Sequence, residues 1–335
     1  MKDSYGRTID YMRISITDRC NLRCKYCMPD GVPMVPMSDI LSLEEIVQIA
    51  SCGAKLGIHN IKVTGGEPLV RKGCASLIRE LKAIPGIECV TLTTNGLLLE
   101  ACLQDLLAAG LDGVNISLDT LNSERYDAIT GTDGLATVKR AIDLAASASL
   151  PVKLNCVSLD WDETFAGDSQ SADGSWRGMV EFARNHPVDV RFIEMMPIGY
   201  GRQFKSLNHQ ELLENMKRLY PDLTADSGSH GPGPAVYYRI PGFQGSIGLI
   251  SAIHGKFCEN CNRVRLTAQG YLKTCLCYED GADLRAVLRN GTGGQVLEEE
   301  LTSAIRQAIL KKPNAHCFER PEEMTEQHSM VMIGG

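Results

Sequence analysis

The chain has 335 residues, of which 44% are hydrophobic and 22% charged, a composition typical of a water-soluble globular protein. Its 34 basic and 41 acidic residues give a formal net charge of −7, which argues against general nucleic-acid binding. No apolar run follows residues 1–7, so we expect no signal peptide. No stretch approaches the ~20 apolar residues that a membrane helix needs. Thirteen cysteines without an export signal predict a reducing, cytoplasmic location.

Short β-branched runs alternate with helical patterns from the start of the chain, and turn residues bound each run, as they bound strands. The runs are Arg13–Thr17, Ile61–Thr64, Val90–Thr94, Val114–Leu118, Val152–Leu159 and Val190–Glu194. Between the first two, Ser42 and Glu45 form a capping box, after which Ile46, Ile49 and Ala50 follow helical spacing. Repeated βα units predict an α/β fold with a parallel sheet, curved into a partial (β/α)6 barrel.

Residues with unusual chemistry follow these predicted strands, at the end of a barrel where active sites are built. They are the loop Cys20–Cys27, the turn Gly65–Pro68, the segment Thr94–Gly96, the strand end Ser117–Asp119 and the segment Met195–Pro197. We therefore expect one site that is shared by several strand ends.

The loop after the first strand carries three thiols, Cys20, Cys24 and Cys27. Thiolates suit zinc and iron–sulfur clusters. A zinc knuckle or an ordinary ferredoxin-type cluster normally needs a fourth ligand close by, which this stretch lacks. Three cysteines on a [4Fe–4S] cube leave one iron free to bind a small molecule, and this is the interpretation we favour.

The spacing of these cysteines, with Tyr26 just before the last, resembles the signature of the radical S-adenosylmethionine (SAM) enzymes. The resemblance implies that the open iron chelates the methionine end of SAM and that Gly66 binds its amino group. It also implies that Tyr26 contacts the adenine, and that Ser117 and Met196 touch the ribose and adenine. On their own chemistry, a plain βα turn at Gly66, a strand-end hydroxyl at Ser117 and a core-filling Met196 remain open alternatives.

The composition shifts to Gly and Pro around Ser227–Pro234, which predicts a boundary between a radical SAM barrel domain over 1–225 and a small C-terminal domain over 226–335. In the second domain we expect short alternating strands, with a hairpin turn at Gln269–Gly270. The acidic segment Asp160–Trp176 interrupts the βα rhythm and is predicted to be a solvated loop, longer than the connection usual in the family.

A second group of three thiols, Cys258, Cys261 and Cys275, lies in the C-terminal part. A zinc ribbon with Cys277 as the fourth ligand is one alternative. However, Cys275 and Cys277 on an extended strand would point to the same face and be awkward ligands for one tetrahedral ion. We favour a second iron–sulfur cluster with an open iron. The other cysteines are predicted to be small buried hydrophobes or bystanders: Cys52, Cys74, Cys89, Cys102, Cys156, Cys277 and Cys317.

Arg263 and Arg265 alternate on a predicted strand, so both side chains should point the same way and suit a phosphate-bearing ligand. The run FCENCNRVRL, followed by Cys275 and by the terminal Gly334–Gly335, resembles the GTP 3′,8-cyclases of molybdenum cofactor biosynthesis. The resemblance covers essentially the whole chain, and its motifs are specific jointly rather than singly.

This resemblance implies a set of GTP contacts, although lone basic residues on a solvated surface remain the alternative. The residues are Arg13, Lys62, Thr93, Lys153, Arg263 and Arg265, with Arg191 as a further candidate. Lys62 departs from the family, which more often has arginine there, and lysine offers a point charge rather than a fork. The resemblance also implies that the Gly334–Gly335 end enters the active site.

The resemblance further implies two [4Fe–4S] clusters and SAM as cofactors. The implied reaction converts GTP to (8S)-3′,8-cyclo-7,8-dihydroguanosine 5′-triphosphate through a 5′-deoxyadenosyl radical. No side chain is expected to act as a catalytic acid or base. The expected partners are a flavodoxin- or ferredoxin-type reductant and the cyclic pyranopterin monophosphate synthase that takes the product, with a homodimer as one allowed arrangement. Two alternatives remain: a radical SAM enzyme that modifies a peptide, and a non-catalytic iron–sulfur electron carrier, which would leave an α/β barrel unexplained.

Overall fold

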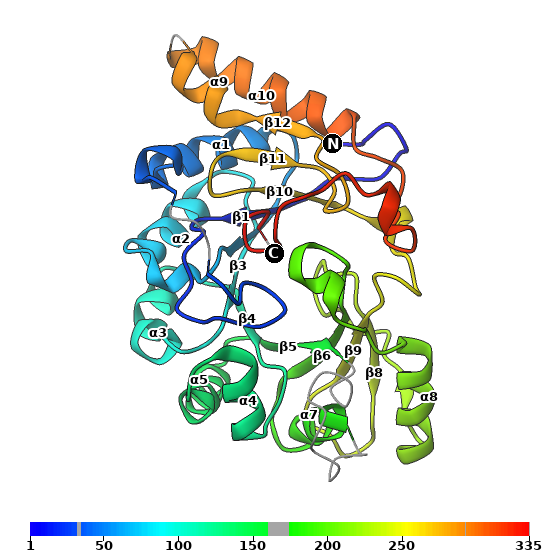
Figure 1. The fold of residues 1–335 in the computed structure, drawn as a ribbon. Coiled ribbons are helices and arrows are strands. Elements are labelled where there is room, and N and C mark those ends of the chain that lie inside the picture. Colours follow the sequence, from blue (N-terminus) through cyan, green and yellow to red (C-terminus); the bar gives the residue numbers. More distant parts are fainter. Residues whose placement is uncertain (32–34, 160–173, 292, 335) are drawn as a thin grey trace.

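The computed structural model describes residues 1–31, 35–159, 174–291 and 293–334. One twelve-stranded sheet organises the chain, in the order β12-β11-β10-β1-β2-β3-β4-β5-β6-β9-β8-β7 (Figure 1). Its strands are β1 (Tyr11–Ser15), β2 (Asn60–Thr64), β3 (Cys89–Thr94), β4 (Gly113–Ser117), β5 (Val152–Ser158), β6 (Asp189–Glu194), β7 (Thr224–Ala225), β8 (Val236–Arg239), β9 (Ile247–Ile250), β10 (Arg263–Leu266), β11 (Tyr271–Lys273) and β12 (Gly281–Asp283). The sheet curves around a central space, in which the C-terminus lies (Figure 1).

The six predicted strands are confirmed as β1 to β6, which lie next to one another in chain order and pair in parallel. Two further parallel strands extend this set: β10 pairs with β1 and β9 pairs with β6. A strand at Arg263 and Arg265 was predicted, but its parallel pairing with β1 and that of β9 with β6 were not, because these partners are far apart along the chain. Antiparallel pairs then finish the sheet at both ends.

Helices cover the outer side of the curved sheet (Figure 1). They are α1 (Leu43–Lys55), α2 (Cys74–Ala83), α3 (Leu99–Ala108), α4 (Ser123–Thr130), α5 (Leu135–Ser147), α7 (Gly174–Asn185), α8 (His209–Leu219), α9 (Leu284–Asn290) and α10 (Gly294–Leu310), with 3-10 turns at Met37–Asp39, Pro68–Val70, Gly199–Gln203, Cys258–Asn260 and Pro321–Glu323. None of the described helices is long and apolar enough to cross a membrane.

The first helix illustrates why these elements form. The predicted capping box is present: the Glu45 amide donates to the Ser42 hydroxyl (3.1 Å), and the Ser42 amide donates to the Glu45 carboxylate (2.7 Å). The apolar stripe of α1 then packs against the sheet, with Ile46, Ile49 and Ala50 fully buried. Local capping and burial of one face together explain where this helix begins and how it lies.

The C-terminal part follows the prediction in some places and departs from it in others. The hairpin turn is confirmed between β10 and β11, where Gly270 has a left-handed φ of 86°. Cys275 and Cys277 are not on a strand, because β11 ends at Lys273, so our reason for separating them as ligands was wrong. The sheet runs through the boundary predicted at residue 225, and the division into two domains stays a prediction.

The predicted loop Asp160–Trp176 falls mainly outside the described residues. Its last part, Gly174–Trp176, is wrong as a loop because these residues form the first turn of α7.

Candidate active site

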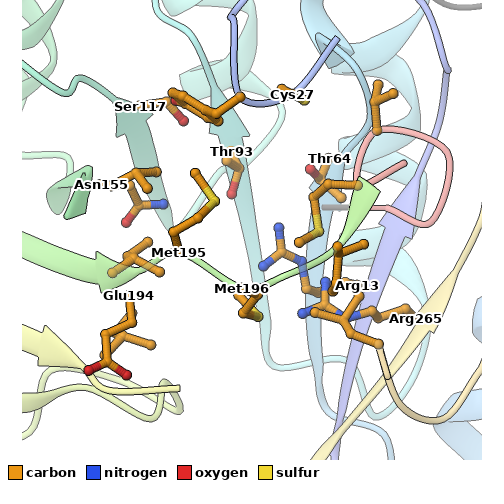
Figure 2. Close-up of a pocket in the computed structure, with 18 of the residues that line it drawn as sticks. Arg13, Cys27, Thr64, Thr93, Ser117, Asn155, Glu194, Met195, Met196 and Arg265 are labelled. Carbon is orange, nitrogen blue, oxygen red and sulfur yellow. The ribbon is translucent and has the colours of Figure 1, made fainter. Parts of the chain in front are cut away.

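A large cavity lies inside the curve of the sheet, at the carboxyl ends of the parallel strands (Figure 2). Most of the predicted site residues line it: Arg13, Cys20, Cys24, Tyr26, Cys27, Gly66, Thr93, Ser117, Met196, Cys258, Cys261, Arg263, Arg265 and Cys275. Residues from both ends of the chain therefore meet at one cavity. Of the predicted GTP contacts, Lys62, Lys153 and Arg191 do not contribute to the wall as the described residues define it.

The loop after β1 presents the first cysteine trio, Cys20, Cys24 and Cys27, to the cavity. The amide of Cys27 donates to the Cys24 carbonyl at 3.0 Å, and the Leu22 amide donates to the Cys20 sulfur at 3.4 Å. Burial raises the pKa of all three thiols, that of Cys27 to about 12. The free thiols therefore hold their protons at neutral pH, and metal binding would release them.

Gly66, in the turn after β2, packs directly against this cysteine loop. A Cβ at Gly66 would lie 2.3 Å from the Arg19 carbonyl oxygen, which is closer than real contacts allow. The Gly66 amide donates to the Thr17 carbonyl at 2.7 Å. With this amide engaged, the Gly66 carbonyl is the backbone group that can meet a ligand, and a carbonyl suits an amino group.

Glu67, which follows Gly66, is a structural residue that the sequence analysis did not single out. Its carboxylate is fully buried and accepts hydrogen bonds from the Asn95 amide and the Thr94 hydroxyl, both at 2.7 Å. It therefore fixes the end of β3 against the turn after β2. The sequence does contain a signal for this role: an acidic residue directly after a Gly-Gly turn at a strand end is placed to accept hydrogen bonds from the end of the neighbouring strand.

Tyr26 is hydrogen-bonded to Asp119, and both residues line the cavity. Its hydroxyl donates to the Asp119 carboxylate at 2.6 Å, and the Val157 amide donates to the other carboxylate oxygen at 2.8 Å. Burial raises the pKa of Asp119 to about 6. Asp119 thus holds the ring of Tyr26 in place, although the sequence analysis noted only its position at a strand end.

The second cysteine trio, Cys258, Cys261 and Cys275, lines the same cavity. Burial acts to raise the pKa of Cys261, but the nearby cations Lys312 and Arg263 outweigh it and lower the pKa. In contrast, burial raises the pKa of Cys258 and Cys275. Cys261 is therefore the thiol of this trio that loses its proton most readily.

The geometry bears on the zinc alternative. Cys277 does not contribute to the cavity wall formed by the described residues; its sulfur lies 3.2 Å from that of Cys317, and both residues are buried. Moreover, no three His, Cys, Asp or Glu side chains of the described residues are placed to share one metal ion. Zinc needs four ligands on one ion, and the described residues do not bring Cys277 to the cavity beside Cys258, Cys261 and Cys275.

Cations from neighbouring strands stand side by side in the sheet. Arg13 on β1 is level with Arg265 on β10 and with Lys62 on β2. Lys62 is buried, and burial together with Arg191 and Arg13 lowers its pKa well below the usual range. Such a cluster of like charges is unfavourable without an anion, so this part of the barrel is suited to a polyphosphate.

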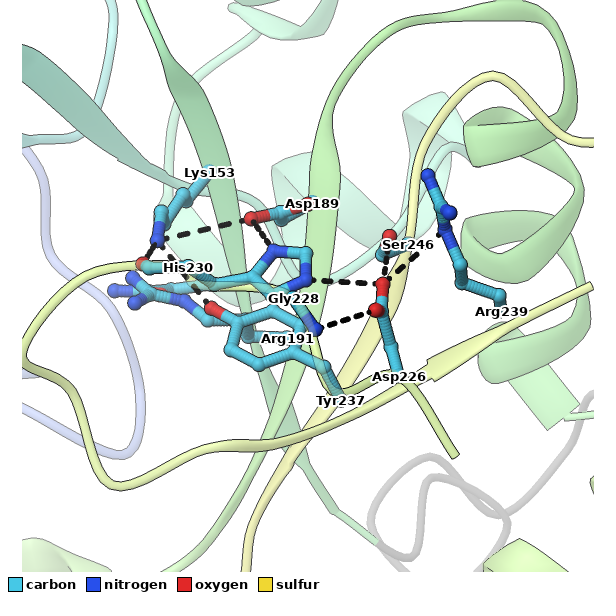
Figure 3. A network of polar contacts seen from close by, with 10 residues as sticks. Lys153, Asp189, Arg191, Asp226, Gly228, His230, Tyr237, Arg239 and Ser246 are labelled. Carbon is cyan, nitrogen blue, oxygen red and sulfur yellow. Dashed lines mark hydrogen bonds and ion pairs between the residues drawn. The ribbon is translucent and has the colours of Figure 1, made fainter. Parts of the chain in front are cut away.

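Lys153, on β5, is held by protein groups (Figure 3). Its ammonium donates to the His230 carbonyl and lies 3.6 Å from the Asp189 carboxylate. The His230 ring stacks on Tyr237 at 3.8 Å and contacts the Asp189 carboxylate at 2.9 Å. A ligand that reaches Lys153 must therefore compete with Asp189 and the His230 loop.

Glu194, at the end of β6, connects the barrel to the segment that precedes the second trio. Its fully buried carboxylate accepts from the amides of Ile253 (2.6 Å) and His254 (3.1 Å) and lies 2.8 Å from the His254 ring. Figure 2 labels it on the cavity wall beside Met195 and Met196. Nothing local in the sequence indicates this bridge, because its partners follow about sixty residues later.

Two family models match the chain. The radical SAM superfamily matches residues 14–160, and the family "Molybdenum Cofactor Synthesis C" matches residues 188–318.

Curated relatives match over the full length. A GTP 3′,8-cyclase from Clostridium perfringens (strain SM101 / Type A) is 42% identical over 336 residues, which covers 100% of both chains. A GTP 3′,8-cyclase from Peptoclostridium acidaminophilum is 43% identical and covers 99% of this chain and 98% of its own. "Molybdenum cofactor biosynthesis protein 1" of Drosophila melanogaster is 40% identical over 96% of this chain and 55% of its own.

Among solved structures, SuiB of Streptococcus suis bound to S-adenosylmethionine superposes with a TM-score of 0.61 and 14% identity. The match covers 97% of this chain and 77% of SuiB, and at this identity it shows a shared fold alone.

Proposed function

Because the chain belongs to the GTP 3′,8-cyclase family of the radical SAM superfamily, we propose that it converts GTP to (8S)-3′,8-cyclo-7,8-dihydroguanosine 5′-triphosphate, the first step of molybdenum cofactor biosynthesis. One observation carries the proposal beyond family membership: two cysteine trios from opposite ends of the chain line one cavity, with arginines beside them. A radical enzyme that joins two atoms of one nucleotide needs a single site that holds both SAM and the nucleotide and excludes water.

The first trio, Cys20, Cys24 and Cys27, would hold the [4Fe–4S] cluster that binds SAM. When bound and reduced, the cluster would supply the electron needed to cleave SAM into methionine and a 5′-deoxyadenosyl radical. The protein's own part is to orient the ligand: the Gly66 carbonyl suits the SAM amino group, and Asp119 fixes the ring of Tyr26.

Ser117 and Met196 complete the proposed SAM site. Ser117 ends β4 and Met196 follows β6, and both line the cavity (Figure 2). A hydroxyl and a flexible thioether suit the ribose and the adenine face, respectively.

The second trio, Cys258, Cys261 and Cys275, would hold a second [4Fe–4S] cluster, which would supply an iron able to bind the guanine. Arg263 and Arg265 lie on β10, between Cys261 and Cys275 in the chain, and Arg13 on β1 is level with Arg265. Guanidinium groups bind phosphate through paired hydrogen bonds, so these three side chains would hold the triphosphate. A substrate held at both ends presents its ribose to the middle of the cavity.

The remaining proposed GTP contacts are less direct. Thr93 lines the cavity and has a buried hydroxyl that accepts or donates no hydrogen bond among the described residues. Lys62 and Arg191 do not line the cavity among the described residues, and bound phosphate would favour the charged form of Lys62, whose pKa is lowered by burial and by neighbouring cations. Lys153 would exchange its bond to the His230 carbonyl for a phosphate.

A substrate comparison tests the proposal. Anaerobically reconstituted protein is reduced with dithionite in the presence of SAM, and 5′-deoxyadenosine is measured with GTP, with ATP and with no nucleotide. We expect GTP to stimulate its formation well above ATP, together with a cyclised guanosine product. Equal stimulation by both nucleotides would contradict the assignment of GTP. A flavodoxin- or ferredoxin-type reductant, transfer of product to cyclic pyranopterin monophosphate synthase and a homodimer stay predictions.

A further inference from the structure

A buried lysine with no role so far lies beside the second cysteine trio. Lys312 follows α10 and is only 3% exposed. Its ammonium donates to the Arg263 carbonyl at 3.0 Å and, through a shorter bond, to the Thr274 carbonyl. Arg263 comes just after Cys261, and Thr274 directly precedes Cys275. Lys312 therefore ties together the two separate segments that supply the trio.

The charge of Lys312 is compensated only in part by these contacts. In the portion of the chain that the structure describes, its bonds go to the Arg263 and Thr274 carbonyls and to the Cys261 thiol, and no carboxylate is paired with it. Burying an ammonium is strongly unfavourable unless negative charge is close by. Lys312 shares the cavity wall with Cys258, Cys261 and Cys275, whose thiolates, when they bind metal, supply that negative charge.

Positive charge near an iron–sulfur cluster makes the cluster easier to reduce, whereas negative charge makes it harder.

We propose that Lys312 is a positioning residue of the second cluster. Lys312 holds together the two segments that carry the cysteine ligands, and its charge raises the reduction potential of the cluster above the value that the cluster would have without the lysine. This inference rests on the second cluster of the proposed function. An electron added to that cluster is stabilised by the nearby ammonium.

The test uses the full chain with Cys24→Ala, in which only the second trio is complete. Lys312→Met and Lys312→Arg are added separately, with Lys311→Met, at an exposed neighbouring position, as the matched control. After anaerobic reconstitution, iron content is measured and the cluster is titrated potentiometrically by electron paramagnetic resonance. We expect Lys312→Met to shift the potential to a more negative value or to lose iron, while Lys312→Arg stays nearer the parent and Lys311→Met equals it.

The outcomes separate the two proposals. Unchanged iron content and potential in Lys312→Met would overturn the role of Lys312 but leave the second cluster intact. A Cys24→Ala parent that binds no iron would overturn the second cluster, and the inference with it.

A measurement on protein without a substitution at Lys312 tests the proposal even if the Lys312 variants fail to fold. In otherwise unaltered protein labelled with 15N at lysine side chains, pulsed electron paramagnetic resonance of the reduced second cluster should detect a lysine nitrogen. The absence of any such coupling would contradict the proximity on which the proposal depends.

Discussion

The guanidinium of Arg265 donates a hydrogen bond to the Gly334 carbonyl at 2.9 Å, and the tail thereby ends against β10 inside the barrel. Met330 and Val331 line the cavity just before this contact. Gly335 lies outside the described residues, so the predicted Gly-Gly end is seen only through Gly334. The tail therefore shares the proposed phosphate-binding arginine with the substrate.

Deletion of residues 334–335 tests the role of the tail. A hydrogen bond to a charged group is worth about 1.5–3 kcal/mol, which corresponds to roughly tenfold or more in an equilibrium. We expect GTP-dependent formation of 5′-deoxyadenosine to fall by about that factor, because Arg265 loses the contact that orients it. Iron content and the thermal midpoint should stay near those of the full chain. Undiminished response to GTP would show that the tail is dispensable.

Arg265→Lys should weaken GTP binding by roughly tenfold, because a lysine ammonium cannot replace the paired hydrogen bonds of a guanidinium to phosphate. Equilibrium binding of GTP to the reconstituted protein measures the effect. Arg140→Lys is the matched control, since Arg140 lies on the outer helix α5 and is exposed. Equal affinities for both variants would exclude Arg265 as a triphosphate contact.

Gly66→Ala should disrupt the first cluster. The added methyl would lie 2.3 Å from the Arg19 carbonyl, so the loop that carries Cys20 must move. We expect the variant to retain about half of the iron, that of the second cluster, with a SAM cleavage rate close to zero. Gly178→Ala in α7 is the control, because a methyl there meets no atom within 4 Å. Full iron retention in Gly66→Ala would contradict the close packing.

Cys24→Ala and Cys258→Ala should each lose about half of the roughly eight irons expected per chain, one cluster from each trio. Cys102→Ser, which changes a half-buried cysteine on α3, should keep all of them. Iron content after reconstitution and gel filtration measures this. Retention of every iron in either trio variant would remove that trio from the cluster ligands.

His209 predicts a pH dependence of stability. Burial lowers its pKa from 6.5 to about 4, so the ring stays neutral in the folded state and contacts the hydroxyls of Ser158 (3.0 Å) and Ser251 (2.9 Å). The unfolded chain binds a proton at the ordinary pKa, so the folded state loses stability as pH falls from about 6.5 toward 4.

Thermal unfolding at several pH values across that window measures the effect. We expect the midpoint of the His209→Gln variant to depend less on pH than that of the unaltered protein, even if it is lower at pH 7. Identical slopes for the two proteins would show that another group is responsible.

The sequence by itself determined the local chemistry. Its informative patterns are short-range, and what each pattern predicts depends on the spacing of a few residues. They are the two cysteine trios, the Arg-x-Arg pair, the Gly-Gly turn and the six β-branched runs. Strand periodicity also placed Arg263 and Arg265 on one face, which the structure bears out, because side-chain direction alternates regularly along any strand.

Only the tertiary structure decided which of these patterns meet. The parallel pairing of β10 with β1 sets Arg265 beside Arg13, about 250 residues earlier in the chain, and no local pattern specifies that register. Likewise, Asp119 reaches Tyr26 and Lys312 reaches the cysteine segments through long-range contacts. Such pairings depend on how the apolar faces of the whole sheet pack, so the supporting residues of the site become visible only in the folded chain.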